Sequence, residues 1–163
     1  MEYPLALLTY YFTMQKCYLA LGCFWKPEEI FRQTKGILKT EVGYAGGDKN
    51  NVSYEEVCEG NTGHAETVKL TFDENIISYE QIIETFFKIH DPTQKDMQYP
   101  DVGTQYRSEI FYEDENQKDI AERIKNKLNK KFDGKIETII SKIKNYCKAE
   151  EYHQQYIMKK RIR

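Results

Sequence analysis

The sequence has little excess charge, no closely spaced pair of cysteines and no long apolar run. Its 24 Lys and Arg residues nearly balance its 26 Asp and Glu residues, giving a formal net charge of −2. This balance argues against a basic face for nucleic acid and gives no reason to expect a membrane partner. The four cysteines include no CxxC pair, and no Cys and His residues have the close spacing of a zinc site. We therefore predict a protein that binds no nucleic acid, no membrane and no metal.

The start of the chain lacks the features of a targeting segment. Residues 1–13 are apolar and aromatic, but they have no basic start and no clear cleavage site, and they are too short to span a bilayer. Met14 is a plausible natural start, so residues 1–13 are expected to be an extension that is disordered or not native; the alternative is an extra edge strand. Residues 14–163 are expected to form a single domain in a reducing cytoplasm, because disulfide frameworks belong to small secreted domains.

Apolar periodicity predicts an α+β protein with two layers. Ser78 can cap a helix over 79–90, whose apolar residues recur on one side while Glu and Gln residues occupy the other. No repeat, second domain or long heptad pattern is present in the sequence, so a monomer is expected. Strands are expected at 16–21, 40–44, 67–72, 107–112 and 136–143, helices at 27–36, 79–90, 115–132 and 149–159, and loops at 48–63 and 91–103.

Cys23 is the strongest candidate for a reactive residue. It follows an apolar segment typical of a buried strand, and it precedes Pro27, which suits the first turn of a helix. Backbone N–H groups at a helix start favour an anion, so we expect a thiolate to be stabilised there. The adjacent Phe24 and Trp25 would surround the sulfur with aromatic rings. These features predict a cysteine-dependent enzyme with an apolar pocket.

The other three cysteines have simpler interpretations. Cys17 lies inside the expected first strand and is predicted to fill the core. Cys58 lies near the 48–63 loop, where packing is favoured and a secondary redox role is open. Cys147 is expected to be either an inert thiol or one that meets another cysteine after oxidation.

Three polar side chains could assist a reactive thiol. Glu66 stands at the entrance of a strand; if it is buried beside aromatic rings, its pKa rises and it can donate a proton near neutral pH. Tyr54 and Tyr106 fall in polar or glycine-flanked loops, where a phenol can wall a pocket and hydrogen-bond an oxygen. His64 has no local Cys partner, and His153 is expected on a helix in a solvated or capping role.

Seven short segments follow one another over residues 15–158. They are Gly22-Cys23-Phe24-Trp25, Gly43-Tyr44-Ala45-Gly46-Gly47, Tyr54-Glu55-Glu56-Val57-Cys58, Gly63-His64-Ala65-Glu66, His90-Asp91-Pro92, Gly103-Thr104-Gln105-Tyr106-Arg107-Ser108 and Ala149-Glu150-Glu151-Tyr152-His153-Gln154-Gln155-Tyr156. In this order they closely resemble the A-type peptide methionine sulfoxide reductase family, which acts on the S epimer of the sulfoxide. The resemblance implies an α+β roll with a ferredoxin-like core, a mixed, mostly antiparallel sheet and flanking helices.

The resemblance also implies a role for each site residue. Cys23 matches the nucleophile, which would become a sulfenic acid as the sulfoxide is reduced. Phe24 and Trp25 match the aromatic walls that receive the S-methyl group of the substrate. Glu66 matches the acid that protonates the sulfoxide oxygen. No cofactor is implied, because the thiol itself supplies the electrons.

Three further positions complete the implied site. Tyr54 and Tyr106 match the phenols that hydrogen-bond the sulfoxide oxygen. Asp101 matches a polar residue that helps to hold water and to support the second half of the reaction. The implied substrates are methionine sulfoxide in proteins and free methionine sulfoxide, and the implied role is the repair of oxidised proteins.

The chain departs from the family pattern where the sulfenic acid must be reduced. Many relatives carry recycling cysteines in a glycine-rich tail, whereas this sequence stops at Arg163. Either Cys147 or Cys58 resolves the sulfenic acid and thioredoxin reduces the disulfide, with Cys147 preferred, or an external small thiol or glutaredoxin does so directly. The alternatives to a reductase are a cysteine hydrolase that pairs Cys23 with His64 or His153, and a binding module for methionine-rich partners.

Overall fold

The computed structural model describes residues 13–163. The expected extension at 1–13 therefore lies outside the described residues, except for Thr13. The strands are β1 (Met14–Leu21), β2 (Ile37–Ala45), β3 (Ala65–Asp73), β4 (Met97–Gln98), β5 (Asp101–Val102), β6 (Ser108–Tyr112), β7 (Ile139–Lys142) and β8 (Cys147–Lys148). The helices are α2 (Trp25–Arg32), α3 (Tyr54–Cys58), α4 (Tyr79–Lys88), α5 (Glu115–Asn129) and α6 (Tyr156–Ile162), with 3₁₀ turns at Thr104–Tyr106 and Glu151–His153.

The main sheet is mixed and mostly antiparallel, as the sequence predicts. Its strand order is β7-β6-β1-β3-β2-β8. β6 and β7 pair in parallel, whereas the other neighbouring strands are antiparallel. The central strands alternate with helices as β1-α2-β2-β3-α4-β6, which is the split βαβ arrangement of a ferredoxin-like core. The α+β roll expected from the resemblance is thus confirmed.

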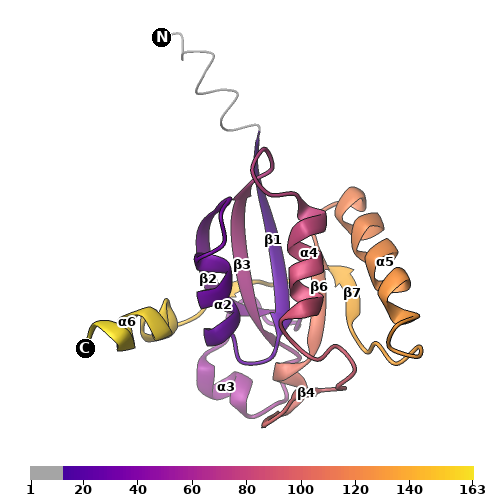
Figure 1. Ribbon diagram of the computed structural model, residues 1–163. Helices are drawn as coiled ribbons and strands as arrows, with labels where there is room; N and C mark the ends of the chain where they lie inside the picture. Colours follow the sequence, from indigo (N-terminus) through magenta and orange to yellow (C-terminus); the bar gives the residue numbers. More distant parts are fainter. Residues whose placement is uncertain (1–12) are drawn as a thin grey trace, which may run out of the picture.

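The helical layer covers one face of this sheet (Figure 1). Along β1, Cys17, Leu19 and Leu21 point into the core shared with the helices, while Tyr18 and Ala20 belong to a smaller cluster on the opposite face. This alternation is the period of two that a strand imposes on its side chains. Cys17 is fully buried, and burial raises its pKa well above the usual range of a thiol. The prediction that it fills the core is confirmed.

Helix α4 follows the sequence pattern closely. The Ser78 hydroxyl accepts the Gln81 N–H, and the Gln81 side chain accepts the Ser78 N–H, which completes a capping box. The apolar side of the helix, made of Ile82, Ile83, Phe86 and Phe87, is buried. Strong amphipathicity and a good cap therefore fix this element from local sequence alone.

The helix expected at 149–159 is wrong. After β8 ends at Lys148, residues 149–150 have no regular structure, a 3₁₀ turn follows, and a helix begins only with α6. The Gln154 side chain bonds to the β2 backbone, accepting the Val42 N–H at 2.9 Å and donating to the Val42 carbonyl at 2.8 Å. Gln155 is left-handed, with φ at 51°. A side chain that bonds to a distant backbone competes with the helix and interrupts it. Such a long-range contact gives no signal in the local sequence.

Two expected loops contain regular structure. The 48–63 loop includes α3, begun by a capping box between Ser53 and Glu56, so Tyr54 and Cys58 lie on a helix. The 91–103 loop includes the β4–β5 hairpin, on which Asp101 lies. Figure 1 shows α3 and β4 gathered at the same end of the sheet. This end carries the candidate site.

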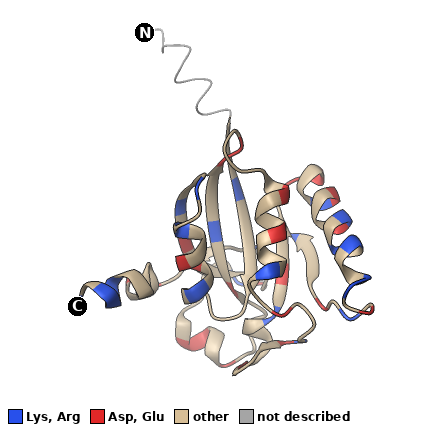
Figure 2. Ribbon diagram, viewed as in Figure 1, with Lys and Arg blue, Asp and Glu red and all other residues tan. Residues whose placement is uncertain are grey.

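In Figure 2, basic and acidic residues are interspersed along α4 and α5, whereas α6 carries only basic charges and α3 only acidic ones. Among residues 13–163, no helix combines the length and apolarity needed to cross a membrane.

Candidate active site

Cys23 lies at the junction between β1 and α2, where the chain turns sharply. Gly22 has φ at +89°, and a Cβ at this position would lie 2.8 Å from the Cβ of Gln98. The turn therefore requires glycine, both for its conformation and for the close approach of the β4–β5 hairpin. The Cys23 side chain is half-buried. It is the one site thiol held between the end of a central strand and the first turn of a helix.

Glu66 is buried beside this junction, at the start of β3. Its side chain is 3% exposed, and one of its carboxyl oxygens accepts the Phe24 N–H at 3.2 Å. Burial raises the pKa of Glu66 to about 8, the Phe24 N–H lowers it in part, and the charge of Asp101 raises it further. The carboxyl is therefore mainly protonated at neutral pH. From the sequence, a neutral Glu66 depended on burial of the side chain, and the side chain is buried.

The expected stabilisation of a Cys23 thiolate is wrong for the resting site. Burial raises the pKa of Cys23 to about 12, and the Trp25 N–H at the helix start opposes this only in part. The charges of Glu66 and Asp101 raise the Cys23 pKa further. Desolvation thus outweighs the helix terminus, and the thiol is protonated before substrate enters.

Two phenols complete the polar part of the site. Burial raises the pKa of Tyr106 to about 12, and the charges of Glu66, Asp101 and Cys23 all contribute. Tyr54, at the start of α3, donates its N–H to Glu150 at 2.9 Å. Its pKa is raised by interaction of its hydroxyl with Cys58, by burial and by the charges of Tyr106 and Glu66. The sequence-predicted residues are therefore within electrostatic range of one another.

Aromatic rings form the other side of the site. Phe24 is 1% exposed and Trp25 is half-buried. The indole N–H of Trp25 donates to Nδ1 of His153 at 3.1 Å, and Tyr156 stacks on the indole with ring centres 3.7 Å apart. The ring of His153 also lies 4.8 Å from that of Tyr54. These contacts fix the plane of the tryptophan ring.

Sequence reasoning missed the roles of His153 and Tyr156 in this wall. The solvated or capping role expected for His153 is wrong, because its side chain is 2% exposed. Since Nδ1 accepts a hydrogen bond, the proton of the neutral ring resides on Nε2, which has no hydrogen-bond partner among the described residues. Both residues belong to the last of the seven segments that carry the family resemblance, and membership of that segment is the sequence feature that could have indicated their roles.

Arg107 ties together the loops that carry the acid and one phenol. Its guanidinium donates to the Gly63 carbonyl at 2.9 Å and to the Thr104 carbonyl at 3.0 Å. The first contact holds the chain three residues before Glu66, and the second holds the turn that contains Tyr106. A forked, planar donor can bridge two carbonyls in this way.

The remaining candidate thiols differ in accessibility. Cys58 is exposed on α3, one helical turn after Tyr54. Cys147 is 9% exposed; burial raises its pKa, and its thiol faces the Val52 carbonyl at 3.9 Å. No disulfide joins the four cysteines.

His64 does not join the candidate site. Its ring nitrogens contact the carbonyls of Thr62 at 3.4 Å and Asn145 at 3.2 Å, and its side chain is 1% exposed. Within residues 13–163, neither His64 nor His153 forms a hydrogen bond with Cys23. The same part of the chain has no group of three or more His, Cys, Asp or Glu side chains arranged to hold a metal.

The site therefore combines a half-buried thiol with a buried carboxyl in its neighbourhood, which fits thiol chemistry. Residues 15–163 match the family described as peptide methionine sulfoxide reductase. The chain is 57% identical over 147 residues to the peptide methionine sulfoxide reductase MsrA of Pelagibacter ubique, covering 90% of this chain and 100% of that one. The chain therefore belongs to the peptide methionine sulfoxide reductase family.

Solved structures agree with this assignment. Reduced Mxr1 from Saccharomyces cerevisiae superimposes with a TM-score of 0.87 at 38% identity, covering 90% of this chain and 86% of that one. Mxr1 in complex with Trx2 gives a TM-score of 0.64 at 25% identity, with coverages of 96% and 89%. The protein is an oxidoreductase that reduces peptide methionine sulfoxide.

Proposed function

We propose that Cys23 is the nucleophile of this reductase and that Glu66 is its acid. The observation that carries the proposal is the buried, protonated Glu66, bonded to the Phe24 N–H next to the Cys23 thiol. A carboxyl that is neutral at pH 7 can donate a proton to an oxygen, which an ionised surface glutamate cannot do. Tyr54 and Tyr106 add O–H donors toward the same oxygen.

The chemistry balances without an external cofactor. Glu66 donates its proton to the sulfoxide oxygen while the Cys23 sulfur attacks the sulfoxide sulfur. As the S–O bond breaks, an S–S bond joins Cys23 to the substrate sulfur and the oxygen leaves as hydroxide. The hydroxide then attacks the Cys23 sulfur and breaks the S–S bond, which releases the thioether of methionine and leaves a sulfenic acid on Cys23. The substrate sulfur is reduced by two electrons and the cysteine sulfur is oxidised by two. The proton of the thiol replaces the one that Glu66 has given up.

The pKa values of the free site imply that substrate binding must promote loss of the Cys23 proton. Cys23 and Glu66 both hold protons near pH 7, so attack requires the thiol proton to leave. A polarised sulfoxide oxygen accepting hydrogen bonds from Glu66, Tyr54 and Tyr106 would make the neighbouring sulfur electrophilic. Asp101, which lies within electrostatic range of both groups, would help to hold the water and support the later step.

We propose the S epimer as substrate, as the family resemblance implies, and the fixed arrangement of wall and donors supports selection of a single epimer. The apolar wall is made by Phe24 and by Trp25, whose plane is set by His153 and Tyr156. A methyl group seated on this wall and an oxygen directed at Glu66 leave one position for the remaining substituent. A site with fixed apolar and polar sides discriminates between mirror-image sulfoxides, because the wrong one leaves buried donors unpaired.

Separate assays of the S and R sulfoxides of a methionine derivative, with dithiothreitol as reductant, test the function. We expect reduction of the S form at a kcat/KM at least about 100-fold above that of the R form, since unpaired polar groups penalise the wrong substrate strongly. Methionine formation measured by chromatography gives both rates. Preferential reduction of the R form would contradict the assignment.

For regeneration, we propose thioredoxin as the reductant and Cys58 as the resolving thiol. The complex of the relative Mxr1 with Trx2 supports the first part. Cys58 is exposed and contacts the Tyr54 hydroxyl, and the pKa of Tyr106 responds to both Cys58 and Cys23. Cys147 is buried and faces a carbonyl. These contacts favour Cys58 over the Cys147 preferred from sequence, while a small thiol or glutaredoxin remains the alternative reductant.

Mass spectrometry after one turnover, with excess sulfoxide and no reductant, distinguishes the routes. Wild-type protein and Cys147→Ser are expected to lose two hydrogens, because Cys23 and Cys58 form a disulfide. Cys58→Ser is expected to gain one oxygen, because its sulfenic acid has no partner. Disulfide formation by Cys58→Ser but not by Cys147→Ser would reverse the assignment, and a sulfenic acid in all three proteins would favour an external thiol.

We also propose that the substrates include both protein-bound and free methionine sulfoxide, and that the protein acts in the cytoplasm as a monomer. The half-buried, accessible Cys23 supports action on a side chain presented at the surface of another protein.

A further inference from the structure

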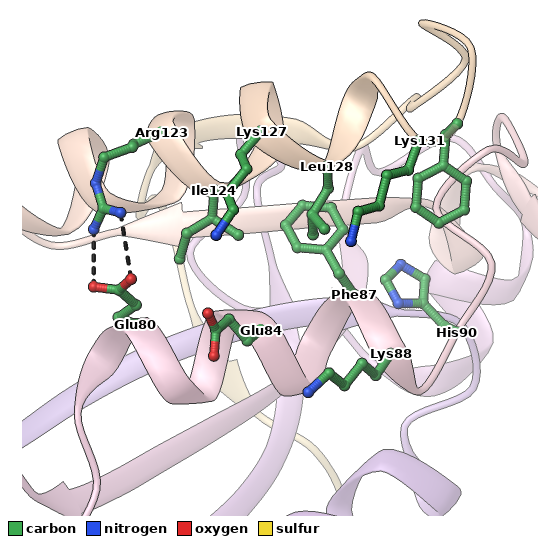
Figure 3. Close-up of a pocket in the computed structure, with 11 residues that line it drawn as sticks. Glu80, Glu84, Phe87, Lys88, His90, Arg123, Ile124, Lys127, Leu128 and Lys131 are labelled. Atoms are coloured by element: carbon green, nitrogen blue, oxygen red, sulfur yellow. Dashed lines mark hydrogen bonds and ion pairs between the residues drawn. The ribbon is translucent and has the colours of Figure 1, made fainter.

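A cavity of about 600 Å³ opens between α4 and α5, and it is lined by none of the residues proposed for the reductase site. This volume lies within the usual range of small-molecule sites. Figure 3 shows side chains from both helices reaching into the space between them. The lining residues are Glu80, Glu84, Phe87, Lys88, His90, Arg123, Ile124, Lys127, Leu128, Lys131 and Phe132.

The base of the cavity is apolar. Phe87 and Ile124 are 4% and 3% exposed, so they form a rigid part of the core. Leu128 and Phe132 are only half-buried and present apolar surface to the cavity. An apolar ligand group placed here would cover surface that water now contacts, which is favourable in proportion to the area removed.

Around the apolar base of the cavity, positively charged side chains outnumber negatively charged ones. Arg123 is already paired, since its guanidinium meets the two oxygens of Glu80 at 2.9 and 3.3 Å. Within residues 13–163, Lys88, Lys127 and Lys131 form no ion pair with any carboxylate. Glu84 is the remaining carboxylate of the lining. With the Arg123–Glu80 pair set aside, the lining holds three lysines and one carboxylate. Figure 3 shows Lys88 directed away from the space between the helices, so the positive charge inside it comes from Lys127 and Lys131.

The histidine of the lining adds no charge. His90 contacts the Phe86 carbonyl through Nδ1 at 2.6 Å and the Ser108 hydroxyl through Nε2 at 2.8 Å. Burial lowers its pKa to about 4. Both nitrogens are occupied, so the excess of positive charge comes from the lysines, and Figure 3 shows Lys127 and Lys131 reaching toward α4.

We propose that this cavity binds a monoanionic amphiphile, namely a medium-chain carboxylate. Its hydrocarbon chain would lie on Phe87, Leu128 and Phe132, and its carboxylate would be held by the lysines of the rim. A dicarboxylate of similar length would place its second charge on the apolar base, and a cation would be repelled by the ammonium groups of the rim. The proposal does not depend on the reductase assignment, since the two sites share no residue.

Three probes of equal chain length test it: octanoate, 1-octanol and octyltrimethylammonium. Each is titrated into the isotopically labelled protein, and amide shifts are followed by NMR. We expect saturable shifts from octanoate in residues 84–90 and 123–132, with an affinity at least about tenfold above that of the neutral and cationic probes. Equal binding of the three probes would overturn the proposal by showing an unspecific apolar groove.

A matched pair of variants locates the anion. Lys131 lines the cavity, whereas its exposed neighbour Lys130 does not. Lys131→Glu is expected to weaken octanoate about fivefold or more, and Lys130→Glu is expected to change its affinity less than twofold, because exposed charges act weakly over distance. Equal effects of the two variants, absence of saturable binding, or shifts confined to other residues would each refute the site. Dimer formation without octanoate binding would do so as well.

Discussion

Cys23→Ser is expected to abolish sulfoxide reduction, with a loss of at least about 10⁴-fold in turnover. The reason is more than lower nucleophilicity. Reduction of a sulfoxide requires two electrons, and in the proposed reaction the Cys23 sulfur supplies them by becoming a sulfenic acid. A serine hydroxyl has no comparable oxidation step. No residue in its place can complete the reaction without a sulfur or selenium atom.

The fold of this variant should be unaffected. Cys23 is half-buried and lies outside the hydrophobic core, so exchanging sulfur for oxygen leaves no cavity and no unpaired group deep in the protein. Cys58→Ser, assayed with dithiothreitol, is the matched control, because an external thiol can replace a resolving cysteine but not the nucleophile. Residual activity of Cys23→Ser above about 1% of wild type would contradict the role proposed for Cys23.

The variant also separates the three classes of function considered for this chain. A binding module for methionine-rich partners would keep its effect without the Cys23 sulfur. A cysteine hydrolase would lose activity when its histidine is replaced, yet His64 bonds to two backbone carbonyls and His153 accepts the Trp25 indole N–H. Neither is arranged as a general base for Cys23, so His64→Ala should affect reduction far less than Cys23→Ser.

The elements fixed by local pattern are those that could be predicted from the sequence. Helix α4 has a capping box at Ser78 and an apolar side. Strand β1 ends in a continuous apolar run, all of it buried, and β3 alternates between buried and half-buried residues over its second half. Both signals come from neighbouring residues. The proximity of Glu66 to Cys23, shown by the bond from the Phe24 N–H to the Glu66 carboxyl, was accessible only through the resemblance, because the pairing of β1 with β3 is long-range.

The parts that could not be predicted depend on contacts distant in sequence. In α2, Glu28 and Glu29 are buried, and Gln155 and Arg161 bond to them from the far end of the chain. The expected helix at 149–159 failed for the same reason, since Gln154 bonds to β2. Side chains that satisfy remote backbone groups leave no periodic signal.

The protonation state of Cys23 depends on a competition between burial and the helix start, and the sequence alone does not show which effect is larger. The helix start was expected to favour the thiolate, but the half-buried sulfur loses more solvation than the Trp25 N–H returns. Only the depth of the site shows which effect is larger. The same depth raises the pKa of Glu66, so the acid is made available by the burial that suppresses the thiolate.

Glu66→Gln is expected to lower kcat/KM by between about 10² and 10⁴, the usual contribution of a general acid. Glutamine keeps the size of the side chain and can still accept the Phe24 N–H, so the variant removes the proton with little other change. Glu74→Gln, at an exposed position, is the matched control and should leave kcat/KM unchanged.

The pH dependence of kcat/KM gives this role a signature that a structural role would not produce. The thiolate fraction of Cys23 rises about tenfold per pH unit below its pKa of about 12, whereas the protonated fraction of Glu66 falls tenfold per unit above its pKa of about 8. In the wild type the two trends cancel above pH 8, so log kcat/KM should rise with a slope near 1 and then become flat. Glu66→Gln has no proton to lose, and its slower rate should continue to rise through pH 8 toward pH 10. Rates measured from pH 6 to 10 decide the matter: a bend near pH 8 that persists in Glu66→Gln would assign it to another group and remove Glu66 from the role of acid.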